Sequence, residues 1–327
     1  MRKLNRILVP TDFSDSSRKA YAYAESLLNV FGGQVDMISI VPTFKYLHES
    51  MKKVGYPFSL DHDVYPHIVE DTEEKVREEL TRYLSAEHRG KEVVRIGRKI
   101  YEIILEYAHK EKYDLIVMGA QGAHAGNIIR GHVTEKVIRF SKIPVLSISG
   151  TVMPDDTGNI LVPTDFSDFS LKALLPAAIM AGRLQSKITL FHVNELHGSE
   201  PEEDDIPEED AIRKFRKKAA QKVESFLAGR PKAELRLESN GNGKFTLHLK
   251  RDAESFSILL ETEQVRGVSA HYEIVDYAGE HADMIVLATH GRSGLSHIFL
   301  GSTVEKVVQS ANIPVLTIRP EEMIQQS

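Results

Sequence analysis

Short apolar runs alternate along this chain with longer segments whose apolar positions recur every three or four residues. The runs have few polar interruptions, which is typical of strands buried on both faces of a sheet. In the first half they cover residues 7–9, 35–41, 115–118 and 145–148. In the second half they cover residues 160–162, 188–193, 284–287 and 315–318.

The segments between the runs carry the period of amphipathic helices. The first begins after Ser14, ends before the pair Gly32-Gly33, and places apolar residues at Ala20, Ala24, Leu27, Leu28 and Phe31. Serine before a helix and glycine after it are the usual terminal residues. Two further segments, at residues 76–84 and 103–108, show the same spacing. Strands that alternate with helices predict an α/β fold with a parallel sheet and helices on both faces.

The two halves are copies of one another. Residues 7–15 read ILVPTDFSD, and residues 160–168 repeat these nine letters. The segments 133–138 and 143–146 return in similar form as 304–308 and 313–316. A polar stretch rich in glycine and proline, residues 150–158, separates the copies as a linker does. We therefore predict two tandem doubly wound domains, residues 1–149 and 159–320. Pro176 stands inside the first predicted helix of the second copy and should bend it.

Two segments differ between the copies. Residues 43–68 form a predicted long irregular loop with the aromatic residues Phe44, Tyr46, Tyr56, Phe58 and Tyr65. Loops of this length are often functional, so the aromatics form either a lid or partner surface or a patch on the adjacent domain. The matching residues 200–210 are almost entirely acidic with two prolines, for which we expect disorder.

An insertion of about residues 233–250 is found in the second copy alone. Two alternating segments flank the turn sequence Asn-Gly-Asn-Gly, which predicts a β-hairpin. Its apolar side comprises Leu235, Leu237, Phe245, Leu247 and Leu249. This side must cover something: its own domain, the other copy, or a docked protein partner.

Composition narrows the classes of function. The 327 residues carry a net charge of -6 and one compact basic run, residues 213–218, so we expect no nucleic-acid partner. There is no cysteine, which excludes disulfides, thiolate metal sites and cysteine nucleophiles. The first apolar run is too short for a signal-peptide core or a membrane span, and we expect a cytoplasmic protein without membrane contact. The histidines are scattered, so no metal is expected apart from magnesium arriving with a nucleotide.

The candidate chemistry lies where the predicted strands end, since open parallel sheets bind ligands at the carboxyl ends of their strands. After Leu287 the chain reads ATHGRSGL, and Gly301-Ser302-Thr303 then opens a helix. Small residues let the backbone approach an anion, and a helix start offers amide donors, so a phosphate fits there. The alternative is that Ser302 or Thr303 only caps the helix.

These motifs also resemble a known family. Residues 162–167 (VPTDFS) with 289–295 (THGRSGL), Gly301-Ser302 and Glu305-Lys306-Val307 look like the universal stress protein family, and the whole chain resembles its tandem form. The resemblance implies mostly five-stranded sheets of order 3-2-1-4-5. The ATP-binding branch of the family has Gly, two residues, Gly, nine residues, Gly, then Ser or Thr. This chain departs only at the first position, which is Ala288.

The resemblance assigns roles to residues of the second copy. Asp165 would face the adenosine part of the ligand beside Pro163 and Thr164, and Val193 would contact adenine through its backbone. The phosphates would be held by the set Gly291, Arg292, Gly301, Ser302 and Thr303. Ala288, which narrows the pocket, and His290 complete the predicted site. The alternative for Asp165 is a helix or turn cap after the first strand.

The first copy carries Asp12, Gly119 and Gly122 but not the full pattern. Only eight residues separate Gly122 from Gly131, and His132 stands where Ser302 stands in the other copy. We expect weak or absent ATP binding there, and the small residues Ala123, Ala125 and Gly126 leave room for another ligand.

The favoured function is an ATP-binding stress-response regulatory protein, a binding module first. A slow ATPase using the same pocket is one alternative, although Arg292 alone is a candidate electrostatic helper and no general base is evident. A nucleotide-independent scaffold or small-ligand carrier, using the hairpin or the aromatic loop, is another. The resemblance implies that the halves pair through residues 143–148 and 313–318 as a pseudo-dimer within the chain, and a further homodimer stays open.

Overall fold

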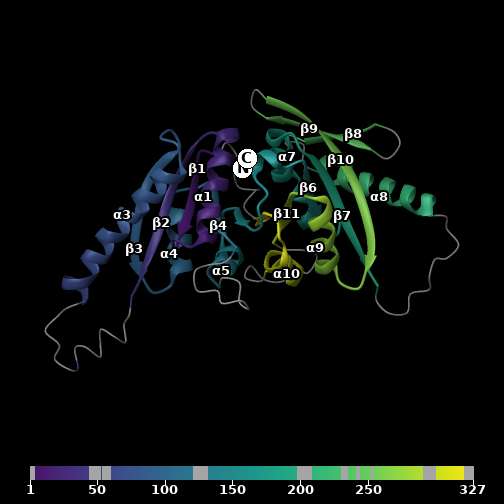
Figure 1. Cartoon of the computed structure of the whole chain (residues 1–327). Helices are drawn as coiled ribbons and strands as arrows, with labels where there is room; N and C mark the ends of the chain where they lie inside the picture. The colour runs from purple at the N-terminus through teal and green to yellow at the C-terminus, as the bar shows by residue number, and fades with distance from the viewer. Residues whose placement is uncertain are drawn as a thin grey trace. The chain divides into compact units, whose positions relative to one another are not determined.

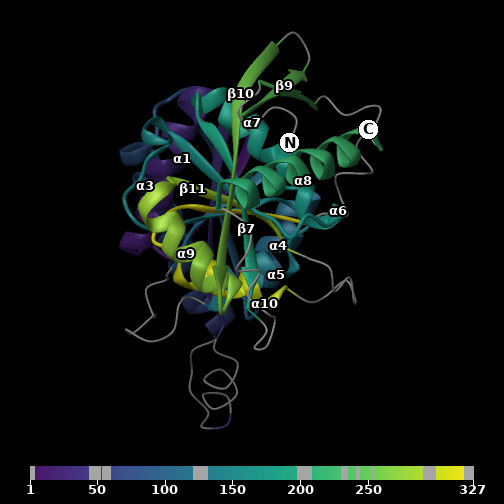
Figure 2. The same ribbon diagram turned by 90° about the vertical axis from the view of Figure 1, so that its right-hand side faces the viewer.

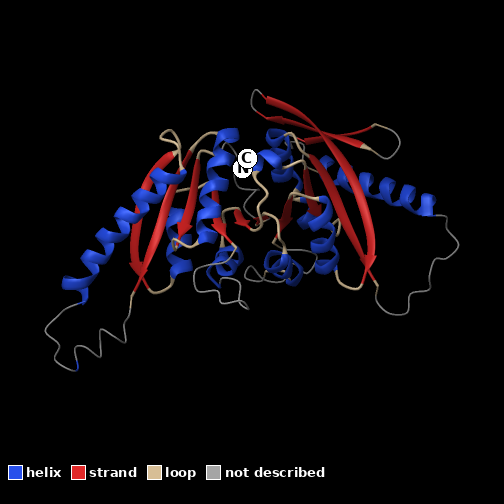
Figure 3. Cartoon of the chain, in the orientation of Figure 1, coloured by secondary structure: helices blue, strands red, loops and turns tan. Residues whose placement is uncertain are grey.

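The computed structural model divides the chain into two compact units, residues 2–148 and 149–327. It describes residues 4–43, 53, 60–120, 132–196, 208–229, 235–240, 244–251, 254–289 and 300–319. In each unit, helices flank a sheet of extended strands (Figures 1 and 3). None of the helices in these described ranges is long and apolar enough to cross a membrane.

The first unit is a doubly wound parallel sheet of strand order β3-β2-β1-β4-β5. This is the predicted order 3-2-1-4-5. Its strands are β1 (Arg6–Thr11), β2 (Gln34–Pro42), β3 (Arg89–Gly97), β4 (Leu115–Gly119) and β5 (Val145–Ile148). Its helices are α1 (Asp15–Phe31), α3 (Tyr65–Tyr83), α4 (Ile100–Lys110) and α5 (His132–Phe140).

The helices cover both faces of this sheet. α1 contacts α3, and α4 contacts α5. Each helix joins two parallel strands by a right-handed crossover. The chain first runs from β1 toward the edge at β3 and later from β4 toward the edge at β5, so the helices of these two directions lie on opposite faces of the sheet. The apolar strand residues are sealed between them, and Ile7, Leu8 and Val9 are fully buried.

The first helix has the predicted ends. The hydroxyl of Ser14 accepts a hydrogen bond from the amide of Ser17, and Gly32, at φ 71°, donates its amide to the carbonyl of Leu28. The φ angle at Gly32 lies in the left-handed region, which glycine adopts without steric cost. The sequence therefore determined both ends of α1.

The predicted loop of residues 43–68 is shorter than expected. A π-helical turn at Leu60–Val64 leads into α3, which begins at Tyr65, so residues 65–68 are helical. Pro66 fits because the first helical turn needs no amide donor. Tyr65 is buried at the start of α3 rather than displayed on a loop. Phe44, Tyr46, Tyr56 and Phe58 lie outside the described residues.

The second unit repeats the sheet and extends it. The strand order is β12-β11-β6-β7-β10-β9-β8, in which the first five strands are parallel and match the order of the first unit. The parallel strands are β6 (Asn159–Pro163), β7 (Lys187–Glu195), β10 (Glu254–Gly267), β11 (Met284–Ala288) and β12 (Val315–Ile318). The helices are α6 (Asp168–Leu171), α7 (Leu174–Leu184), α8 (Glu208–Ala228), α9 (Ala270–His281) and α10 (Ser302–Ser310), and a 3-10 turn at Pro154–Asp156 precedes β6.

Pro176 interrupts the first helix of this unit, as its position predicted. The helix is divided into α6 and α7, with Lys172 and Ala173 between them. The amides of these two residues bond three residues back, to the carbonyls of Phe169 and Ser170. Proline has no amide to donate to the carbonyl of Lys172, and its ring crowds that carbonyl, so the division lies one turn before it.

The insertion forms the predicted hairpin, of β8 (Leu235–Ser239) and β9 (Phe245–Arg251). β9 then pairs antiparallel with the first half of β10, whose second half pairs with β7. Figure 2 shows β10 as one long strand that joins the hairpin to the parallel sheet.

The apolar side of the hairpin covers its own unit. Leu235, Phe245, Leu247 and Leu249 are buried, and β8 and β9 contact α8 and α7 respectively. At Gly182 of α7 a Cβ atom would lie 2.7 Å from the ring of Phe256 in β10, so glycine permits this close packing. The insertion therefore belongs to the core of the second unit. Of the acidic segment 200–210, the structure describes only residues 208–210, which are the first residues of α8 rather than disordered.

Candidate functional site

The same strained turn follows the first strand of each unit. Phe13 and Phe166 have φ angles of 62° and 57°, in the left-handed region that bulky residues avoid. In both turns the preceding threonine, Thr11 or Thr164, accepts the phenylalanine amide on its hydroxyl at 2.9 Å. Such strain persists only where the surroundings hold it, and it is often found at functional sites.

The aspartate between threonine and phenylalanine helps to hold this turn. Asp165 Oδ1 accepts the amide of Ser167 at 2.9 Å, and Asp12 Oδ1 accepts that of Ser14 at 3.1 Å. The turn-cap role that was the alternative for Asp165 is therefore present in both units. Asp165 is half-buried, whereas Asp12 is exposed.

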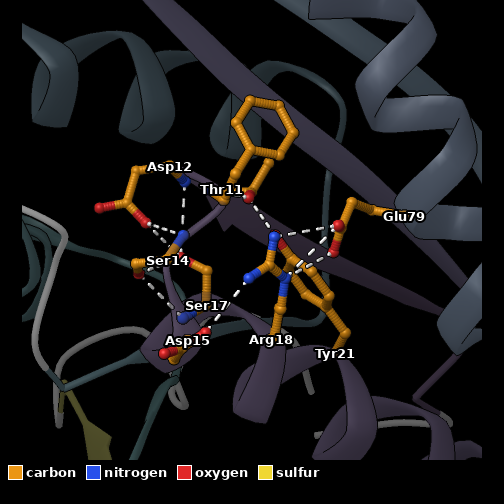
Figure 4. Close-up of polar contacts among 9 residues, drawn as sticks. Thr11, Asp12, Ser14, Asp15, Ser17, Arg18, Tyr21 and Glu79 are labelled. Carbon is orange, nitrogen blue, oxygen red and sulfur yellow. Dashed lines mark hydrogen bonds and ion pairs between the residues drawn. The ribbon is translucent and has the colours of Figure 1, made fainter.

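In the first unit a serine hydroxyl also donates a hydrogen bond to the aspartate. Tyr21 is buried, and its phenol bonds to the hydroxyl of Thr11. Ser17 Oγ donates to Asp12 Oδ1 at 2.7 Å (Figure 4). Burial raises the pKa of Tyr21 above its usual value, so this phenol stays protonated at neutral pH.

In the second unit the threonine hydroxyl of this turn has a different hydrogen-bond partner. Leu174 stands where Tyr21 stands in the first copy, and a leucine offers Thr164 no hydrogen bond. Ser170 Oγ lies 2.9 Å from Thr164 Oγ1 instead, and it donates to the carbonyl of Ser167 at 3.0 Å. In the second unit the corresponding serine hydroxyl therefore bonds to Thr164. The Tyr21 and Leu174 difference, visible when the copies are aligned, could have indicated this.

An ion pair lies beside the turn of the first unit. Arg18 Nε is 3.3 Å from Glu79 Oε2, and the side chain of Glu79 is 9% exposed. The same guanidinium reaches Asp15 at 3.1 Å (Figure 4). This pair couples α1 to α3. Leu171 occupies the position of Arg18 in the second copy, so that unit has no counterpart of the guanidinium.

The end of β7 lies next to the turn of the second unit. Pro163 is in register with Phe191, and Val193, two residues further along β7, is half-buried. The Nδ1 atom of His192 is 2.8 Å from the carbonyl oxygen of Thr164. The structure thus brings the predicted residues Pro163, Thr164, Asp165 and Val193 to the carboxyl ends of β6 and β7. Reasoning from the sequence missed His192.

The predicted phosphate end lies at β11 and α10. Thr289, just after β11, accepts the amide of Gly301 on its carbonyl at 3.1 Å. Gly301 is the N-cap of α10 and, as a glycine, has no side chain with which to cap the first turn. The amide of Gly301 is therefore engaged within the chain, and the next amides at this helix start are those of Ser302 and Thr303. Ser302 is exposed and Thr303 half-buried.

The corresponding corner of the first unit is more crowded. At Gly119 a Cβ atom would lie 2.6 Å from the backbone carbonyl of Ser16. The buried Thr134 donates its hydroxyl to the carbonyl of Gly119 at 2.9 Å, and Val304 occupies its position in the second copy. Ala288 replaces Gly119 in the second unit and is itself buried.

Several predicted residues lie outside the described residues. They are His290, Gly291 and Arg292 of the second copy and, in the first copy, Gly122, Ala123, Ala125, Gly126 and Gly131. Within the parts of the chain that the structure does describe, no group of three or more His, Cys, Asp or Glu side chains is placed to hold a metal ion.

Comparison with known proteins agrees with this architecture. A model of the universal stress protein family matches residues 3–149 and again residues 157–319. Universal stress protein MJ0577 of Methanocaldococcus jannaschii is 28% identical over 168 residues, which cover 49% of this chain and 93% of that protein. Universal stress protein MJ0531 of the same organism is 42% identical over 72 residues, 22% of this chain and 42% of that protein.

A solved structure extends the likeness to the full length. The crystal structure of a universal stress protein from Archaeoglobus fulgidus covers 97% of this chain, and 99% of its own chain is matched, with a TM-score of 0.65 and 21% identity. At this identity the likeness concerns the fold. The two family matches, one in each unit, decide the assignment: this chain belongs to the universal stress protein family, with two family domains in tandem.

Proposed function

We propose that the chain binds ATP in its second domain and acts as a stress-response regulatory protein whose conformation or partners depend on the nucleotide. Family membership supports a role in stress response. The geometry of the two turns supports the choice of the second domain.

The observation that carries the proposal is the different burial of the two aspartates. Asp165 is half-buried beside the end of β7, where its Oδ1 accepts the amide of Ser167. Asp12 is exposed, and it accepts both the amide of Ser14 and the hydroxyl of Ser17. A half-buried carboxylate binds hydroxyl groups more strongly than an exposed one, because water competes less. Asp165 is therefore the better acceptor for the sugar hydroxyls of a nucleoside.

The phosphate end of the proposed site is the start of α10. The amides of Ser302 and Thr303 and the positive end of the helix dipole favour an anion. The two hydroxyls add donors. Gly291 and Arg292 would complete the cradle, and magnesium would bridge phosphate oxygens as it does for most bound ATP.

The chemistry proposed here is binding. Asp165 would hold the nucleoside, the backbone of Val193 would contact the base, and the start of α10 would hold the phosphates. Four of the five apolar residues of the hairpin, Leu235, Phe245, Leu247 and Leu249, are buried within its own unit, which favours nucleotide binding over a scaffold function that would use the hairpin as a docking surface.

Isothermal titration of the full chain with ATP and magnesium, after bound nucleotide has been removed, tests the proposal. We expect one site per chain. Asp165→Asn should weaken binding about tenfold or more, the loss expected when a charge-assisted hydrogen bond is removed. Asp12→Asn is the matched control, since it makes the same change in the other copy, and should leave the affinity unchanged.

The opposite pattern would contradict the proposal. Loss of binding in Asp12→Asn with normal binding in Asp165→Asn would place the site in the first domain. A wild-type chain that binds no ATP, and yields no nucleotide when a fresh preparation is denatured, would remove the nucleotide assignment altogether.

A further inference from the structure

We propose that His192 is a positioning residue of the ATP site, which holds Asp165 in place through the backbone of Thr164. The inference rests on the proposed function and adds to it a residue that the sequence motifs did not indicate. His192 lies on β7, while Thr164 and Asp165 follow β6.

The hydrogen bond between His192 and Thr164 has a defined direction. A carbonyl oxygen only accepts, so the Nδ1 atom, 2.8 Å away, must carry the proton and donate. The amide of Thr164 in turn donates to the carbonyl of Phe191 at 2.8 Å. Both polar groups of the Thr164 backbone are thus fixed by β7. Since the Thr164 carbonyl belongs to the peptide that leads into Asp165, its orientation sets the direction in which Asp165 leaves the sheet.

Two aromatic rings fix the imidazole of His192. The ring of Phe166 lies 5.2 Å away between centroids, and that of Phe215 on α8 lies 6.1 Å away and nearly parallel, at 13°. Phe166 and Phe215 also contact each other, at 6.0 Å. Phe166 is the residue with the left-handed backbone, so the cluster explains how the strained turn is held.

The first copy provides a natural comparison. Ser39, in register with Thr11, stands where His192 stands in the second copy, and it is buried. A serine hydroxyl is too short to fill the space of an imidazole or to stack on phenylalanine rings. The aromatic cluster is therefore built in the domain to which the nucleotide is assigned.

Three variants of His192 separate positioning from simple packing. His192→Ala removes the donor and the ring. His192→Asn keeps a donor, because the asparagine amide nitrogen lies close to where the imidazole Nδ1 lies. His192→Leu keeps bulk but offers no donor. The exposed His248→Ala is the control for loss of a histidine outside the site.

Affinities for ATP and for inorganic tripolyphosphate are then measured by titration. His192→Ala and His192→Leu should bind ATP about tenfold more weakly, as expected for one lost hydrogen bond to an ordered site. Tripolyphosphate binding should not change, since it does not involve Asp165. His192→Asn should restore most of the ATP affinity. In an Asp165→Asn background, His192→Ala should cause little further loss, because the two residues act in series.

A second readout does not need the nucleotide. The amide of Ser167 donates to Asp165 Oδ1, so its hydrogen exchange reports whether the carboxylate is in place. It should exchange faster in His192→Ala and His192→Leu than in His192→Asn, at equal global stability. Ser39→Ala should not change the exchange of the Ser14 amide in the first unit.

Two results would overturn the inference. One is an equal loss of ATP and tripolyphosphate affinity in His192→Ala, or a loss fully additive with Asp165→Asn, which would mean a general structural role. The other is unchanged exchange at Ser167. A wild-type chain without ATP binding would refute the proposed function instead, and the exchange at Ser167 would still decide whether His192 holds Asp165.

Discussion

Replacing Gly119 by alanine tests how closely the first helix approaches the sheet of the first unit. The added Cβ would lie 2.3 Å from Ser16 Oγ and 2.6 Å from the carbonyl carbon and oxygen of Ser16. The hydroxyl can rotate away, but the carbonyl belongs to the first turn of α1 and moves only with the helix. Overpacking of this kind costs about 1–3 kcal/mol. Alanine recovers about 0.5–1 kcal/mol of glycine's excess conformational entropy, so the net loss should be up to about 2.5 kcal/mol.

Urea denaturation with hydrogen exchange resolved by peptide is the suitable assay, because a two-unit chain need not unfold in one step. The free energy of opening for the segments containing α1 and β4 should fall, while the second unit keeps its protection. Gly279→Ala is the matched control. This glycine lies in α9 with no atom within 4 Å of a built Cβ, so the same substitution should stabilise by about 0.5–1 kcal/mol. Equal effects of the two substitutions, or full protection of α1 and β4 in Gly119→Ala, would refute the close-approach argument.

Two further predictions concern the cores of the units. Leu247→Ala should destabilise the second unit by about 2–5 kcal/mol, because Leu247 is fully buried in the hairpin. Thermal unfolding measures this loss, with substitution of the exposed Lys250 by alanine as the control. Equal melting temperatures of the two variants would mean that the hairpin does not belong to the core. Burial, together with a 2.5 Å hydrogen bond to Asp36, raises the pKa of Tyr113 above its usual value of about 10. Above pH 10 only the unfolded state releases this proton, so stability should fall with a slope of up to about 1.4 kcal/mol per pH unit. Tyr113→Phe should flatten that slope in alkaline urea titrations, and an unchanged slope would contradict the assignment.

Much of the fold follows from local patterns. The buried strands, the cap at Ser14, the stop at Gly32 and the hairpin were readable because each depends on residues within a few positions of one another. The break at Pro176 was readable for the same reason, since a missing amide acts on its own helix. The start of α3 was not predicted, although Tyr65, Ile68 and Val69 have helical spacing, because Tyr65 was counted among the loop aromatics and its burial is a tertiary contact.

The candidate site also combines features that the sequence determined with features that only the tertiary structure decided. The sequence determined that the chain holds two copies of one fold, that Asp165 and Gly301 follow strands, and that Val193 lies in the last part of a strand. The tertiary structure decided how these residues are used: the amide of Gly301 is engaged by Thr289, Ser170 turns to Thr164, and His192 holds the Thr164 carbonyl. Each of these depends on groups competing for the same donors and acceptors in three dimensions. Two copies with the same nine-residue motif therefore differ in their sites because their neighbours, such as Tyr21 and Leu174, differ in what they can bond.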